Sequence, residues 1–113
     1  PYIAKQEFEP WKSLIAELAK FPNVACKISG LVTEAKWKSW KVSDFTPYTD
    51  HIIESFSPER LMYGSDWPVA LLGAENYSEV FSLAESVTSQ LSNADKEAFW
   101  CSNARRIYQI TNL

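Results

Sequence analysis

The aspartate at position 66 is the side chain best placed to do chemistry. Residues 61–66 predict a short β-strand, and Trp67-Pro68 follows at once, where the proline removes a backbone donor. In α/β folds, ligands bind beyond the carboxyl ends of the strands. A carboxylate there can ligate a metal ion or accept a proton from an attacking water. Asp66 is therefore a candidate catalytic base and metal ligand, with capping of the following turn as the structural alternative.

Lys27 and Ser29 form a second candidate group. Residues 24–29 predict another strand, closed by Gly30, and side chains two residues apart share one face of a strand. A lysine within a buried strand is unfavourable unless its charge is paired. Lys27 could bind a substrate carboxylate or an anionic intermediate, or it could pair with a carboxylate of the protein. Ser29 could hydrogen-bond a substrate or serve a structural role.

The connection over residues 31–45 contributes Glu34, Trp37 and Trp40, and Trp67 lies beside Asp66. Aromatic side chains often wall a pocket for a sugar or another ring. These residues are therefore candidate substrate contacts. The alternative is that the tryptophans pack beneath the loop.

The remaining reactive residue types indicate structural roles. His51 is the one histidine of the chain, so a histidine-rich metal site cannot be built from this sequence alone. Its helix has a separate apolar face, which predicts a surface or helix-packing histidine. Cys26 and Cys101 are too few for a disulfide framework, and both are predicted to be inert, buried thiols.

The elements that must position these residues follow from hydrophobic periodicity and capping signals. Helices are predicted at residues 9–20 and 77–91, and from Thr46-Pro47 to Phe56 with the proline in the first turn. Ser92-x-x-Asp95 predicts the cap of a last helix. Strands alternating with helices imply parallel pairing and right-handed crossovers. Two parallel strands do not complete a sheet, so the pattern is typical of a piece of a larger α/β protein.

Length and charge limit the classes of protein. The chain has 113 residues, enough for one domain, and its net charge of −3 disfavours a nucleic-acid partner. No run of about 18 apolar residues predicts a membrane span, and no secretory signal is visible. We therefore expect a reduced, cytoplasmic protein.

Several stretches resemble one known family. Leu-Met-Tyr-Gly-Ser-Asp-Trp-Pro-Val at residues 61–69, preceded by Phe-Ser-Pro-Glu-Arg at 56–60, is similar to the last-strand signature of amidohydrolase-related TIM-barrel hydrolases. Residues 22–31, 33–40 and 103–108 resemble the family's seventh strand, the loop after it and the closing helix. The nearest branch comprises sugar-lactone and dicarboxylate-lactone hydrolases of the L-fuconolactonase and L-rhamnonolactonase type.

The resemblance implies a partial (β/α)₈ barrel of the α/β class. Residues 1–113 would be the C-terminal segment of a single barrel domain, with the last two strands, their flanking helices and a C-terminal helix. Such a barrel needs about 250 residues. The family's histidines from earlier strands have no counterpart in this sequence. We therefore expect this chain to be inactive alone and to have an unpaired sheet edge through which it could self-associate.

The resemblance also implies roles for individual residues. Asp66 would be the general base and, in metal-dependent members, a metal ligand. The substrate, a small-molecule lactone, would contact Lys27, Ser29, Glu34, Trp37 and Trp67. A divalent metal, zinc or manganese, would belong to the complete protein, with none bound to this chain alone. The alternatives are another amidohydrolase-type hydrolase or decarboxylase, and a non-catalytic interaction module.

Overall fold

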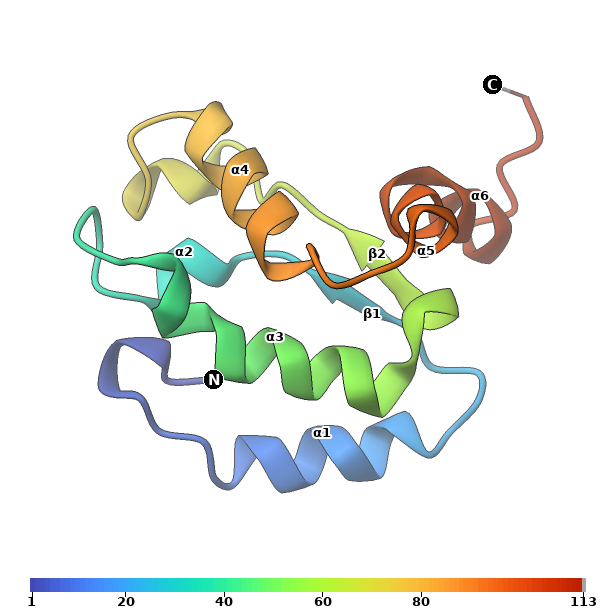
Figure 1. Cartoon of the computed structure of the whole chain (residues 1–113), viewed down its shortest axis with the longest axis horizontal. Helices are drawn as coiled ribbons and strands as arrows, with labels where there is room; N and C mark the ends of the chain where they lie inside the picture. The colour runs from blue at the N-terminus through green and yellow to red at the C-terminus, as the bar shows by residue number, and fades with distance from the viewer. Residues whose placement is uncertain (113) are drawn as a thin grey trace.

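The computed structural model describes residues 1–112 and shows a two-stranded parallel sheet flanked by helices (Figure 1). The helices are α1 (Trp11–Ala19), α2 (Leu31–Glu34), α3 (Val42–Phe56), α4 (Tyr77–Val87), α5 (Asn93–Glu97) and α6 (Asn103–Ile107), and the strands are β1 (Cys26–Ile28) and β2 (Leu61–Tyr63). Short 3₁₀ turns form at Ile3–Lys5, Pro58–Arg60 and Val69–Leu72, and a π-helical stretch at Ala98–Ser102 joins α5 to α6. This order confirms a small, partial α/β unit.

One face of the sheet packs against helices. Cys26 pairs with Leu61 and Ile28 with Tyr63, so these four side chains alternate onto the same side. There they meet Ile52 and Phe56 of α3 and Phe99 of the π-helical stretch, all buried. The helices form a row in which α3 contacts both α1 and α4, while the C-terminal helical segment packs on β2.

A second core cluster joins α3 to α4. Phe45 and Tyr48 of α3 are almost fully buried, and Leu83 and Val87 of α4 pack with them. The Phe8 ring stacks on Tyr48 at a centroid distance of 4.5 Å, and the Tyr48 hydroxyl donates to the Glu7 carbonyl at 2.9 Å. The N-terminal segment is thereby fixed to the helical layer.

The start of α3 corrects a prediction. The helix begins at Val42, and Pro47 lies in its second turn rather than in its first. The Asp44 carboxylate accepts a hydrogen bond from the Lys41 backbone N–H at 3.0 Å, which caps the helix one turn earlier than expected. Pro47 has no backbone N–H, so the helical hydrogen bond to the carbonyl of residue 43 is not made.

Other predicted boundaries were too long. The strands span three residues each rather than residues 24–29 and 61–66. α4 ends at Val87 rather than at residue 91, and the Thr88 hydroxyl donates back to the Ala84 carbonyl at 2.7 Å. The predicted cap of the last helix is confirmed, because Ser92 Oγ accepts from the Asp95 backbone N–H at 3.1 Å.

A cluster of side-chain donors holds the turn before β2. The Arg60 guanidinium donates to the carbonyls of Phe56, Phe21, Val24 and Ala19 at 2.8–3.0 Å. The buried Asn103 amide donates to the carbonyls of Pro58 and Leu61 at 2.8 and 2.9 Å. These contacts tie α1, α3 and α6 to the start of β2.

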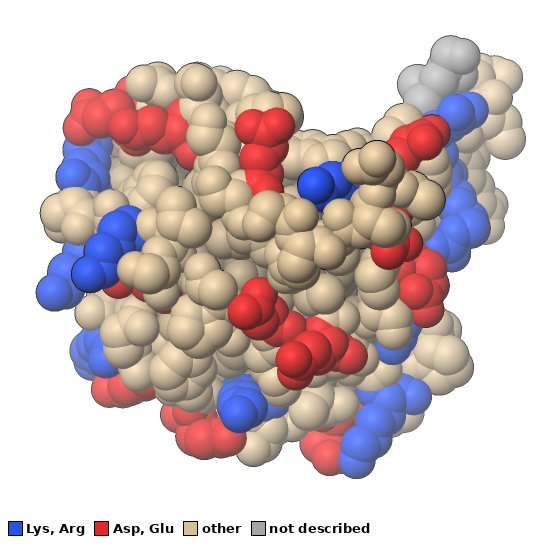
Figure 2. All heavy atoms as spheres, viewed as in Figure 1, with Lys and Arg blue, Asp and Glu red and all other residues tan. Residues whose placement is uncertain are grey.

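The surface mixes both signs of charge. Acidic and basic side chains are interspersed over the face in Figure 2, in keeping with the small net charge. Within residues 1–112, no helix combines the length and apolar character needed to cross a membrane.

Candidate functional site

Asp66 stands just beyond the carboxyl end of β2. Its backbone has a φ of 54°, a left-handed conformation that aspartate adopts more readily than most residues. Its carbonyl accepts from the Ala70 N–H at 2.8 Å, so the backbone rather than the carboxylate closes the following turn. A Cβ atom at Gly30 would lie 3.5 Å from Asp66 Oδ2, which places the carboxylate where both strands end.

The half-buried carboxylate is free for chemistry within this chain. Among residues 1–112 it accepts no hydrogen bond, and the capping alternative is therefore not what the structure shows. A cavity of about 10 Å³ lies beneath the strand ends, bordered by Gly30, Ser65 and Asp66. That space holds about one water molecule, so a ligand of sugar size has to approach from the open side.

Lys27 and Ser29 lie on the sheet face opposite the helices, as predicted. A Cβ atom at Gly64 would lie 2.6 Å from Ser29 Oγ and 3.8 Å from Lys27 Cδ, so both side chains flank Gly64. Both are exposed, which removes the burial expected for Lys27. The Lys27 ammonium lies 5.7 Å from the Tyr108 ring centroid. Among the residues the structure describes, the two ion pairs involve other lysines.

Ser29 and Glu34 share a second, larger cleft. It has a volume of about 720 Å³ and lies between the end of β1 and the side of α1 that carries Trp11, Leu14 and Leu18. Leu14 and Leu18 are 63% and 45% exposed. The cleft therefore combines polar groups at the strand end with an uncovered apolar helix face.

The side chains of Trp37, Trp40 and Trp67 do not line one common pocket. The Trp37 ring is exposed, its Nε1 donates to the Thr33 carbonyl at 3.0 Å, and it borders neither of these two cavities. Trp67 is 45% exposed and packs edge-on against Tyr77. Trp40 packs against Phe45, so for Trp40 the structural alternative is confirmed.

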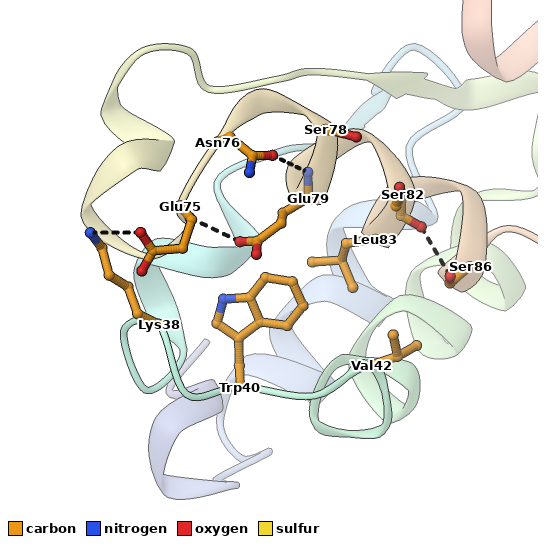
Figure 3. Close-up of a pocket in the computed structure, with 10 residues that line it drawn as sticks. All are labelled: Lys38, Trp40, Val42, Glu75, Asn76, Ser78, Glu79, Ser82, Leu83 and Ser86. Atoms are coloured by element: carbon orange, nitrogen blue, oxygen red, sulfur yellow. Dashed lines mark hydrogen bonds and ion pairs between the residues drawn. The ribbon is translucent and has the colours of Figure 1, made fainter.

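Figure 3 shows another groove, away from the strand ends. Its volume is about 440 Å³, and Lys38 and Trp40 face α4 across it. The Glu79 carboxylate accepts from the Glu75 backbone N–H at 2.9 Å, and Asn76 Oδ1 accepts from the Glu79 N–H at 3.0 Å. These polar groups cap the start of α4, so we assign them a structural role rather than a catalytic one.

The histidine and the cysteines have the following environments. His51 Nε2 lies 2.8 Å from the Lys12 carbonyl and its ring meets Trp11, which confirms a helix-packing role. Cys26 faces the helices, and burial raises the pKa of its thiol. Cys101, predicted to be buried, is exposed, because the π-helical stretch turns it outward while Phe99 packs inward.

Two residues near the site were not singled out from the sequence. Gly73 is packed so closely that a Cβ atom there would lie 2.3 Å from the Val32 carbonyl oxygen. The Tyr63 hydroxyl is buried without a hydrogen-bond partner, and burial together with the neighbouring Tyr77 hydroxyl raises its pKa. For Gly73, the only signal in the sequence was a glycine inside an apolar loop. For Tyr63, there was no signal in the sequence.

Comparison with known proteins gives consistent matches. A family model described as amidohydrolase matches residues 1–110. The L-fucono-1,5-lactonase of Burkholderia multivorans is 46% identical over 105 aligned residues, covering 88% of this chain and 35% of the lactonase. The L-fucono-1,5-lactonase of Burkholderia ambifaria is 34% identical over 113 aligned residues, covering 97% of this chain and 39% of that enzyme.

Solved structures agree with these matches. The crystal structure of an amidohydrolase from Burkholderia multivorans with bound zinc superposes with a TM-score of 0.86 at 43% identity, covering 98% of this chain and 41% of that chain. Amidohydrolase 2 from Bifidobacterium longum subsp. infantis superposes with a TM-score of 0.66 at 26% identity. The chain spans between 35% and 41% of the length of these four relatives. Because the family match extends over nearly the whole sequence and the fold superposes closely, the chain belongs to the amidohydrolase family.

Proposed function

We propose that residues 1–113 are the C-terminal segment of a (β/α)₈-barrel amidohydrolase that opens a sugar lactone. The observation that carries this proposal is the unpaired Asp66 carboxylate at the shared carboxyl edge of β1 and β2. The similarity to two L-fucono-1,5-lactonases supports the choice of substrate class. Chemistry at this edge is what parallel α/β folds provide.

In the proposed reaction Asp66 accepts a proton from water. The water oxygen attacks the lactone carbonyl, the ring C–O bond breaks, and the departing alkoxide takes the proton back from Asp66 to give the hydroxy acid. Ser29 and Glu34, which border the large cleft, contact the polar groups of the substrate, and Trp67 covers one side of it. Lys27 lies further from the strand end on the same face and stabilises the anionic intermediate that forms when water attacks the carbonyl. Trp37 stays a prediction from the sequence alone.

The chain can supply one ligand to a divalent metal. Asp66 offers a hard oxygen donor of the kind that zinc accepts. Among residues 1–112, no three His, Cys, Asp or Glu side chains converge, so the other ligands would come from outside this chain. When bound, zinc or manganese would polarise the carbonyl and acidify the attacking water.

The complete site requires more of the fold than this chain contains. The side chains of Lys27 and Ser29 are exposed, and each of the two strands has a free edge within residues 1–112. We therefore propose that the chain alone is inactive and associates through these edges.

A chimera tests the proposal. Residues 1–110 of this chain replace the matching segment of the Burkholderia multivorans L-fucono-1,5-lactonase, and hydrolysis of L-fucono-1,5-lactone is measured. The expected result is a folded enzyme with lactonase activity. A folded chimera without activity toward lactones would contradict the proposal. Turnover of amides or decarboxylation substrates, but not of lactones, would favour another amidohydrolase reaction.

A further inference from the structure

The Trp67 side chain, directly after Asp66, packs against Tyr77, the first residue of α4. The ring centroids of Trp67 and Tyr77 are 5.5 Å apart at an interplanar angle of 78°, a T-shaped pair. Both rings are about half exposed, at 45% and 44%, so few other contacts hold Trp67 in place. The orientation of the residue next to the candidate base therefore depends on Tyr77.

The backbone at Tyr77 is itself fixed. Asn76 Oδ1 accepts from the Glu79 backbone N–H at 3.0 Å, and the Glu79 carboxylate accepts from the Glu75 N–H at 2.9 Å. The first bond satisfies a free N–H in the first turn of α4 and fixes where the helix begins, and the second joins that turn to the residue before the cap. Tyr77 thus presents its ring from a rigid position.

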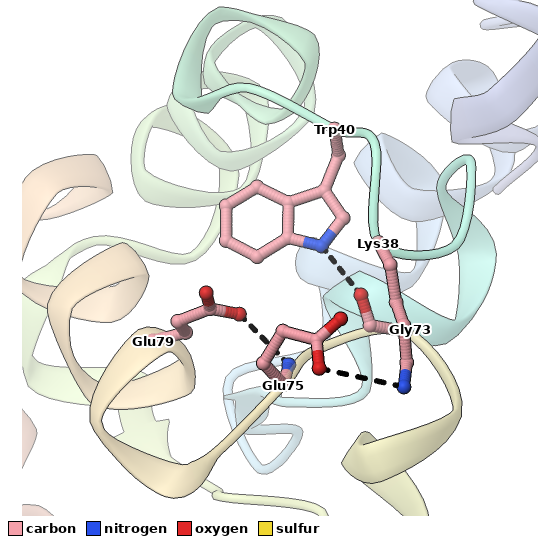
Figure 4. A network of polar contacts seen from close by, with 5 residues as sticks. All are labelled: Lys38, Trp40, Gly73, Glu75 and Glu79. Carbon is pink, nitrogen blue, oxygen red and sulfur yellow. Dashed lines mark hydrogen bonds and ion pairs between the residues drawn. The ribbon is translucent and has the colours of Figure 1, made fainter.

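The segment between Trp67 and Tyr77 is held near its middle by hydrogen bonds to the Gly73 carbonyl. The Gly73 carbonyl accepts from the Trp40 indole Nε1 at 2.7 Å and from the Lys38 backbone N–H at 2.9 Å. Figure 4 shows Trp40 pointing at this carbonyl, with Lys38 paired to Glu75 beside it. On its other side Gly73 rests on the Val32 backbone of α2. Residues 67–77 therefore form a strap fixed at Gly73 and at the cap of α4.

We infer that Tyr77 is a positioning residue, which holds the Trp67 ring in place as the wall of the proposed substrate site next to Asp66. The inference rests on the proposed function, since it names what keeps that site in place. Tyr77 acts on Trp67 through its ring, because the two side chains meet as an edge-to-face pair, while the Tyr77 hydroxyl neighbours that of Tyr63.

The test uses the chimera with Tyr77→Ala, Tyr77→Phe and a matched control, Phe81→Ala. Phe81 lies one turn further along α4, is 37% exposed and packs on Tyr63 and Trp100 rather than on Trp67. An aromatic pair contributes about 1 kcal/mol, which corresponds to about a fivefold change. We expect Tyr77→Ala to lower kcat/KM about fivefold, mainly through a higher KM, and the other two variants to keep both constants. Equal kcat/KM for Tyr77→Ala and the unmodified chimera, or an equal loss in Tyr77→Phe, would overturn the inference.

A second measurement does not depend on activity. With 5-fluorotryptophan incorporated, the fluorine resonance of Trp67 is assigned by its loss in Trp67→Phe. Tyr77→Ala should shift or broaden this resonance, while Tyr77→Phe leaves it sharp and Phe81→Ala leaves it in place. An inactive unmodified chimera in which the resonance responds as expected would reject the proposed function but keep the packing role of Tyr77. An unchanged resonance in Tyr77→Ala would reject the positioning role itself.

Discussion

Replacing the half-buried Arg60 by methionine should strongly destabilise the chain. The side chain donates to four backbone carbonyls, those of Ala19, Phe21, Val24 and Phe56, and its guanidinium lies 5.2 Å from the Phe56 ring centroid. These carbonyls come from the end of α1, the turn before β1 and the end of α3. Methionine keeps much of the stem's apolar contact but removes every donor.

The magnitude follows from the number and exposure of these bonds. A hydrogen bond from a charged donor contributes about 1.5–3 kcal/mol when it is sheltered from water. Arg60 is half-buried, and water can replace part of what is lost at the more exposed carbonyls. Arg60→Met should therefore lower the free energy of unfolding by about 3 kcal/mol, a large part of the 5–15 kcal/mol typical of a folded domain.

The assay is equilibrium unfolding in urea, followed by far-ultraviolet circular dichroism at low protein concentration. The control is Arg105→Met, an exposed arginine of α6, which should change the free energy by less than about 0.5 kcal/mol. An unchanged urea slope with a lower midpoint would show that stability has fallen. A loss of less than about 1 kcal/mol for Arg60→Met would refute the reasoning.

Two further predictions test packing and thiol chemistry. Gly73→Ala forces a Cβ atom against the Val32 carbonyl, so unfolding in urea should show a loss of about 2 kcal/mol or more; an unchanged midpoint would contradict the close approach. Burial raises the pKa of the Cys26 thiol, so a smaller fraction of it is thiolate at pH 8. A disulfide reagent should therefore modify the exposed Cys101 first, which the single variants Cys26→Ser and Cys101→Ser can measure. Faster modification of Cys26 would contradict this.

The order of elements could be predicted because it depends on local signals. Apolar periodicity marked α1 and α4, and Ser92 marked the start of α5. The start of α3 could not be predicted in the same way. Thr46-Pro47 is a strong signal for a helix start, but the Asp44 carboxylate caps the Lys41 N–H and begins the helix one turn earlier.

The position of Asp66 could also be predicted, whereas the roles of its neighbours could not. Trp40 and Trp67 are both tryptophans in loops. The Trp40 indole donates a hydrogen bond to the Gly73 carbonyl, whereas the Trp67 ring packs against Tyr77. The partners that decide these roles are 33 and 10 residues away in sequence. Such contacts exist only once the chain has folded, so the spacing of residues in the sequence does not predict them.

Residues that carried the family resemblance prove largely structural. Arg60 and Asn103 lie in two of the similar stretches, and both donate to the backbone around the start of β2. Arg106 adds a hydrogen bond to the Glu59 carbonyl. These residues of the similar stretches thus hold the start of the last strand, while Asp66 is the residue that bears chemistry in our proposal.

The central claim is that Asp66 is the base of a lactone-hydrolysing site, and Asp66→Asn in the chimera tests it most directly. The control, Asp95→Asn, removes the same charge from a half-buried aspartate in α5, far along the chain from the strand ends. General-base catalysis contributes roughly 10²–10⁴-fold, so kcat for L-fucono-1,5-lactone should fall at least a hundredfold in Asp66→Asn and stay unchanged in Asp95→Asn. Folded Asp66→Asn protein with kcat within tenfold of the unmodified chimera would contradict the claim.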